Sequence, residues 1–116
     1  MRHRRVGRIL KRERGQRDAL LKSLMRSLVL KNAIVTTEAK AKEVRPRLER
    51  LVTKEIKGTL AGHREVISRI GNDAAGRLKK DIVPRVGARK GGYLRITKHG
   101  IRKGDGARLA RISFVD

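Results

Sequence analysis

The chain has 116 residues and a formal net charge of +21, from 32 Lys and Arg residues against 11 Asp and Glu residues, and it contains no cysteine. This length predicts one domain with a small core, and the missing thiols exclude a disulfide framework, a thiolate zinc site and a catalytic cysteine. No apolar run approaches the roughly 20 residues that a membrane span needs, and the basic start is not followed by the apolar segment of a signal peptide.

The excess of positive charge makes a compact chain repel itself unless a polyanion neutralises it. Arg outnumbers Lys by 20 to 12, and its planar guanidinium suits phosphate oxygens and base edges better than the diffuse charge of an anionic membrane. The net charge is +9 in residues 1–35, +5 in residues 36–81 and +7 in residues 82–116. We therefore expect a nucleic acid as the partner, contacted mainly by the two ends of the chain.

Residues 1–15 are the first expected element, a basic arm. This segment has too little apolar surface to fold alone, so we expect it to become ordered on its ligand. The alternatives are a disordered tail that only improves solubility, and a transit peptide, because such peptides are rich in Arg and poor in acids. The candidate contacts in the arm are Arg2, His3, Arg4, Arg5, Arg8, Lys11, Arg12 and Arg14.

An amphipathic helix is expected over residues 16–31, where leucines recur every four residues from Leu20 to Leu28. Its polar side carries Lys22 and Arg26 one turn apart, a like-charge pair that costs roughly 0.2 to 0.5 kcal/mol unless an anion lies across it. A solvated face is the alternative interpretation. The candidate contacts on this helix are Arg17, Lys22 and Arg26.

Residues 33–36 are β-branched and predict a short strand that leads into a second helix. Thr37 is placed to cap this helix, which we expect to run from Glu38 to about Lys57. Pro46 removes a backbone donor and predicts a kink, or a restart near Arg45. The polar face forms a basic ridge, which we rank below the arm as a contact surface because this third of the chain is the most nearly balanced in charge: Arg47, Arg50, Lys54 and Lys57.

Two short helices and a β-hairpin are expected in the rest of the chain. The first helix ends at Gly71, and Asn72 or Asp73 caps the second, which runs to about Asp81 and is stopped by Pro84. Residues 93–98 and 107–115 then alternate as two paired strands.

The loop of this hairpin, residues 99–106, combines glycines with basic side chains. Such a loop lets the backbone approach a phosphate closely, although an ordinary hairpin turn needs the glycines as well. The candidate contacts in the hairpin are Arg95, Lys98, Arg102 and Lys103.

Patterns that indicate catalysis are scarce. His3, His63 and His99 do not have the spacing of metal ligands, the acids are interleaved with bases, and no P-loop glycine motif occurs. We therefore expect no catalytic site, metal, cofactor or small-molecule substrate. An RNA-processing enzyme would need a site assembled in space from Glu, Asp and His.

The aromatic content separates modes of nucleic-acid recognition. Modules that read unpaired bases use aromatic platforms, whereas this chain has only Tyr93 and Phe114. Recognition of backbone and shape by Arg and Lys remains, which suits folded RNA or DNA bound with little sequence preference. A DNA-binding architectural protein is therefore the main alternative to an RNA-binding protein.

Four stretches of the sequence carry a resemblance to a known family. The most specific is the run from Thr36 to Glu43, Thr-Thr-Glu-Ala-Lys-Ala-Lys-Glu. The stretches are Met1–Arg4, Arg17 with Ala19–Leu21, Ile34–Pro46, and Gly91–Ile96 with Arg102–Ala107. In this order, over nearly the whole chain, they resemble the L17 family of bacterial large-subunit ribosomal proteins.

This resemblance implies an α+β fold, with several helices packed on a small mixed sheet, a C-terminal β-hairpin and an extended N-terminal arm buried in large-subunit rRNA. It implies a structural protein near the peptide exit tunnel, beside neighbouring ribosomal proteins, and no enzyme activity. The family's opening residues coincide with Met1, which leaves no room for a transit peptide and favours the cytoplasm. The arm contacts Arg2, His3, Arg4, Arg5 and Arg8 are carried over, and Lys40, Lys42 and Arg45 are added. We expect residues 16–116 to form the single domain behind the arm.

Overall fold

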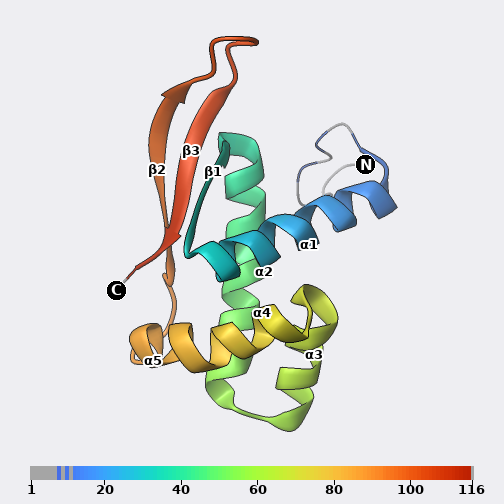
Figure 1. The fold of residues 1–116 in the computed structure, drawn as a ribbon, viewed down its shortest axis with the longest axis vertical. Coiled ribbons are helices and arrows are strands. Elements are labelled where there is room, and N and C mark those ends of the chain that lie inside the picture. Colours follow the sequence, from blue (N-terminus) through green and yellow to red (C-terminus); the bar gives the residue numbers. More distant parts are fainter. Residues whose placement is uncertain (1–7, 9, 11, 116) are drawn as a thin grey trace, which may run out of the picture.

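Helices packed on one face of a three-stranded sheet give an α+β fold in the computed structural model, which describes residues 8, 10 and 12–115 (Figure 1). This confirms the predicted fold class. None of the helices in these residues is both long and apolar enough to cross a membrane. In chain order the elements are α1 (Arg14–Lys31), β1 (Ala33–Thr37), α2 (Glu38–Lys57), α3 (Leu60–Ile70), α4 (Asn72–Arg77), the π-helical turn η1 (Leu78–Ile82), α5 (Val83–Val86), β2 (Leu94–Ile101) and β3 (Arg108–Phe114).

Helices α1 and α2 agree closely with the sequence prediction. Helix α1 begins at Arg14, two residues earlier than predicted, and ends at Lys31. Helix α2 has the predicted bounds, and the Thr37 hydroxyl accepts a hydrogen bond from the backbone N–H of Lys40 at 3.4 Å. The predicted restart near Arg45 is wrong, because α2 continues through Pro46. Packing holds the helix together here, since the flanking apolar side chains Val44 and Leu48 are fully buried.

The helical segment after Gly71 is longer than predicted. Pro84 was expected to stop it near Asp81, but the chain passes through η1 and continues as α5 to Val86. In η1 the N–H of Val83 bonds to the carbonyl of Leu78, five residues back, and Pro84 then lies in the first turn of α5, where a missing N–H costs little. Buried side chains along the whole segment keep it on the core.

The sheet has the strand order β1-β3-β2 and is antiparallel throughout, not mixed as expected. Strand β3 is central, so Arg111 lies beside both Val35 of β1 and Thr97 of β2. The predicted loop over residues 99–106 is too long, because β2 continues to Ile101. A register shift between Lys98 and Gly100 allows this, with Gly100 in the left-handed region at φ 107°.

Helix α2 is the centre of the core. It contacts all three strands on one side and α1 and α3 on the other, as Figure 1 shows. The inward side chains of β3, including Ile112 and Phe114, pack in the same buried cluster as Leu48 and Val52 of α2. This arrangement brings the outward faces of α1, α2 and α3 next to one another.

Candidate nucleic-acid interface

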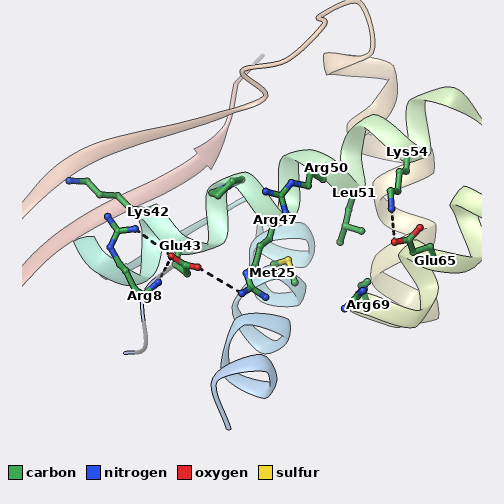
Figure 2. Close-up of a pocket in the computed structure, with 11 residues that line it drawn as sticks. Arg8, Met25, Lys42, Glu43, Arg47, Arg50, Leu51, Lys54, Glu65 and Arg69 are labelled. Atoms are coloured by element: carbon green, nitrogen blue, oxygen red, sulfur yellow. Dashed lines mark hydrogen bonds and ion pairs between the residues drawn. The ribbon is translucent and has the colours of Figure 1, made fainter. Parts of the chain in front are cut away.

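A groove of about 610 Å³ lies where α1, α2 and α3 meet (Figure 2). It is lined by Arg8, Met25, Lys42, Glu43, Pro46, Arg47, Arg50, Leu51, Lys54, Glu65 and Arg69. A second hollow of about 530 Å³ shares Met25, Arg47 and Arg69 with it. This hollow adds Arg14, Arg17, Asp18, Ala19, Lys22 and Ser68. We call the two together the basic groove, since nine of these described side chains are basic and three are acidic.

Helix α2 supplies the central wall of the basic groove. Arg47, Arg50 and Lys54 follow one another at spacings of three and four residues, so they lie on one face. The opposite apolar stripe is buried, which fixes the rotation of the helix and turns this face outward. The first three members of the predicted ridge therefore line the groove, although the sequence ranked them below the arm.

The acids of the basic groove are each held by cations. Glu43 lies 3.4 Å from Arg8 and 3.8 Å from Arg47, and Asp18 lies 3.9 Å from Arg47. Lys54 bonds Glu65 at 2.5 Å, and this contact lowers the pKa of the Glu65 carboxyl. Each acid of the groove is thus already paired with a cation of the protein, and the charge of Arg69 contributes to the lowered pKa of Glu65 as well.

Five cations of the basic groove make no ion pair in the part of the chain that the structure describes. They are Arg14, Arg17, Lys22, Arg50 and Arg69. A concave surface with several uncompensated cations attracts a polyanion, and the guanidinium fork fits phosphate oxygens. The groove therefore has the chemistry of a phosphate-backbone site.

Arg26, predicted as a contact on α1, has a different position. Its guanidinium makes two parallel bonds to the carboxylate of Asp73 and donates to the carbonyl oxygen of Ile70 at 3.2 Å. The bonds from Arg26 lower the pKa of Asp73 to about 2. The expected repulsion from Lys22 is thus relieved by a protein carboxylate, and Arg26 serves to join α1 to the start of α4.

The predicted contacts at the start of α2 are partly compensated as well. Lys42 bonds Glu38 at 2.7 Å and Arg45 lies 3.6 Å from Glu49, as expected for pairs four residues apart. Lys40 makes no ion pair with any residue that the structure describes. The pKa of Glu38 is lowered, chiefly by Lys42 and to a smaller extent by the charges of Arg108 and Lys98. Strand pairing of Thr37 with Leu109, and of Lys98 with Ala110, brings the hairpin to this end of α2.

The hairpin extends beyond the helices (Figure 1). At its tip Arg102 donates to both carboxylate oxygens of Asp105, at 3.0 and 2.8 Å, and holds the pKa of that carboxyl well below its ordinary value. Lys103 is exposed beside this pair, and Arg95 and Lys98 are exposed on β2. Of the predicted hairpin contacts, only Arg102 is held by an ion pair within the described residues.

Most predicted arm contacts lie outside the described residues: Arg2, His3, Arg4, Arg5 and Lys11. Arg8 lies on the rim of the basic groove. Arg12 donates to the carbonyl oxygen of Leu10 at 3.0 Å.

The described residues hold no cluster of three or more His, Asp or Glu side chains that could bind a metal ion. His63 pairs with the buried carboxylate of Glu55, with 2.8 Å from Nδ1 to Oε1, and so joins α3 to α2. Sequence reasoning did not find Arg69, because its position on α3 reaches the groove only through the packing of α3 on α1 and α2. A basic residue near the end of a short helix gave no signal of this.

Comparison with known proteins gives one consistent family. The model for the family of ribosomal protein L17 matches residues 20–115. The large ribosomal subunit protein bL17 of Gemmatimonas aurantiaca is 48% identical over 116 residues, which cover 99% of this chain and 98% of that protein. The bL17 protein of Allorhizobium ampelinum is 47% identical, covering 100% of this chain and 83% of its own length. That of Shouchella clausii is 44% identical, covering 91% and 96%.

Proposed function

The chain belongs to the ribosomal protein L17 family, and on that basis we propose that it is a structural constituent of the large ribosomal subunit, not an enzyme, that binds and stabilises folded large-subunit rRNA. The observation that carries the RNA-binding part is the basic groove, in which five cations make no ion pair with any described residue. The relatives of this chain are named as large ribosomal subunit proteins, which agrees with the proposed structural role.

The proposed mechanism is neutralisation of phosphates that converge when RNA helices pack. Arg50 and Arg69 line one part of the groove, and Arg14, Arg17 and Lys22 line the other. Each contact to a phosphate releases condensed counterions, and this supplies binding energy without reading the base sequence. Because a shared core fixes the helices, the backbone positions that carry these cations are set before the RNA arrives, which lowers the entropy cost of binding.

We propose the arm and the hairpin as further contacts on the same RNA. The arm contributes Arg2, His3, Arg4, Arg5 and Arg8, and the hairpin contributes Arg95, Lys98 and Lys103. Lys40, in the first turn of α2, is a further proposed contact, because it makes no ion pair with any described residue. Contacts on several sides of one small domain would let the protein join RNA segments that otherwise repel each other.

We also propose that the protein acts in the cytoplasm, near the peptide exit tunnel and beside other ribosomal proteins. This part of the proposal follows from the family alone. Protein cross-linking in purified large subunits, followed by identification of the linked neighbours, tests it: links to proteins remote from the tunnel exit would contradict this location.

The RNA-binding mechanism is tested by the salt dependence of binding. For about 6 to 10 contacted phosphates, the affinity of the isolated protein for an rRNA transcript should fall by roughly 10³ to 10⁵ between 50 and 200 mM salt. A flat response would contradict the mechanism. Competition with duplex DNA separates RNA binding from general DNA binding, because an architectural DNA-binding protein would bind both equally well.

A further inference from the structure

Glu43 is an unusual acid in the basic groove because its side chain is only 9% exposed. Its carboxylate accepts hydrogen bonds from the backbone N–H of Arg8 at 3.2 Å and from the Arg8 guanidinium at 3.4 Å. The guanidinium of Arg47 lies 3.8 Å away on the next turn of α2. Figure 2 shows Glu43 between these two Arg side chains on the groove wall.

A carboxylate here opposes the function of the surface, because it repels the phosphates that the groove is proposed to bind. Taking it out of water also costs free energy unless cations and donors compensate it. The pair with Arg47 is a common contact four residues along a helix. The bond to the backbone N–H of Arg8 is different, since it joins α2 to a residue 35 positions away within the predicted arm.

We propose that Glu43 is a positioning residue that fixes Arg8 on the rim of the basic groove and aims Arg8 and Arg47 at the same RNA strand. Both side chains keep donors for a phosphate, because Arg8 is 47% exposed and Arg47 is 37% exposed. Glu43 thus sets the point at which the arm's cations join those of the groove. This inference rests on the proposed RNA-binding function.

The proposal and simple electrostatics predict opposite changes in RNA affinity when Glu43 is replaced. Removing an acid from an RNA-binding surface should tighten binding if charge were the only effect. We expect the Glu43→Gln variant to bind about threefold to tenfold more weakly, since Arg8 and Arg47 lose their shared anchor. The matched control is Asp18→Asn, which removes the same charge from the same groove. Asp18 also lies 3.9 Å from Arg47, but its side chain is 55% exposed and, unlike Glu43, accepts no hydrogen bond from Arg8. Water therefore screens its charge, and we expect this variant to bind about twofold more tightly.

The experiment measures the affinity of the full-length protein for a large-subunit rRNA transcript at one moderate salt concentration, with thermal unfolding as the check on folding. A Glu43→Gln variant that binds as tightly as the unsubstituted protein, or more tightly, overturns the positioning role while the proposed function stands. An unsubstituted protein that does not bind the transcript overturns both.

The Arg8→Ala variant gives a second test that leaves α2 intact. It must weaken binding more than Arg64→Ala, which removes the same charge from an exposed position on α3 outside the groove. Adding Glu43→Gln to Arg8→Ala should then cost less affinity than Glu43→Gln does alone. Equal losses for Arg8→Ala and Arg64→Ala, or fully additive losses in the double variant, overturn the proposal.

Discussion

Arg26 on α1 and Asp73 on α4 are joined by two parallel hydrogen bonds across 47 residues of sequence. The same guanidinium donates to the carbonyl oxygen of Ile70, the last residue of α3. One side chain therefore holds α1 against the junction of α3 and α4. This contact helps to fix the shape of the basic groove, because residues of α1 and α3 line it.

The ion pair of Arg26 and Asp73 should make the stability of the protein depend on pH in the acid range. The pKa of Asp73 is lowered from 3.8 to about 2 in the folded protein, so its contribution is complete above about pH 4 and is lost as the pH falls toward 2. We expect the Asp73→Asn variant to unfold at a lower temperature than the unsubstituted protein at neutral pH, with the difference shrinking between about pH 4 and pH 2. Thermal unfolding followed by circular dichroism across this range checks it, and a difference that does not change with pH would contradict the assignment.

The core prediction concerns Leu48, which is fully buried in the centre of α2. The Leu48→Ala variant should lower the free energy of unfolding by about 2 to 5 kcal/mol, because it removes buried methyl groups and leaves a cavity between the helices and the sheet. The control is Leu60→Ala, whose side chain is 65% exposed at the start of α3 and should change the free energy by less than about 0.5 kcal/mol. Urea unfolding measures both, and similar losses would argue against α2 as the centre of the core.

The groove prediction concerns Arg50 and Arg69, which make no ion pair with any described residue. If each binds one phosphate, each Ala substitution should reduce the slope of log affinity against log salt by about 0.7 to 0.9. The Arg64→Ala control lies outside the groove and should leave the slope unchanged. Binding measured at several salt concentrations tests this, and an equal change for Arg64→Ala would show that only net charge matters.

The hairpin prediction concerns Arg102 and Lys103. Because Asp105 already holds the Arg102 guanidinium, we expect the Arg102→Ala variant to lose less RNA affinity than Lys103→Ala. The Asp105→Asn variant releases Arg102 and should bind about twofold more tightly. The affinity of the three variants for one rRNA transcript decides the matter. The reverse order would mean that RNA displaces Asp105 from Arg102.

Local signals explain how much of the fold could be predicted. The bounds of α2 follow from a capping Thr37 and from Gly58, which ends the helix in the left-handed conformation. Pro84 misled the prediction because its effect depends on the π-helical turn before it, which no local pattern indicates. The end of β2 was misplaced because glycines around the hairpin suggested a turn where one of them permits a register shift.

The site was harder to predict than the fold because it is formed by packing. The sequence shows that Arg47, Arg50 and Lys54 share a helix face, but not that Arg69 and the cations of α1 lie beside them. The sequence likewise shows Lys22 and Arg26 as a like-charge pair. It gives no sign that Asp73, far along the chain, forms an ion pair with Arg26. Charge counts therefore predict a type of partner, a nucleic acid, but they do not predict the surface on which the cations gather.

The most direct test is RNA cross-linking in sedimented large subunits, mapped residue by residue on this protein. We expect cross-links at the basic groove, in peptides that contain Arg14, Arg17, Arg50 and Arg69, together with the arm and the hairpin tip. Cross-links confined to α4 and α5, with none on the faces of α1, α2 and α3 that form the groove, would contradict the claim that this groove binds the RNA backbone.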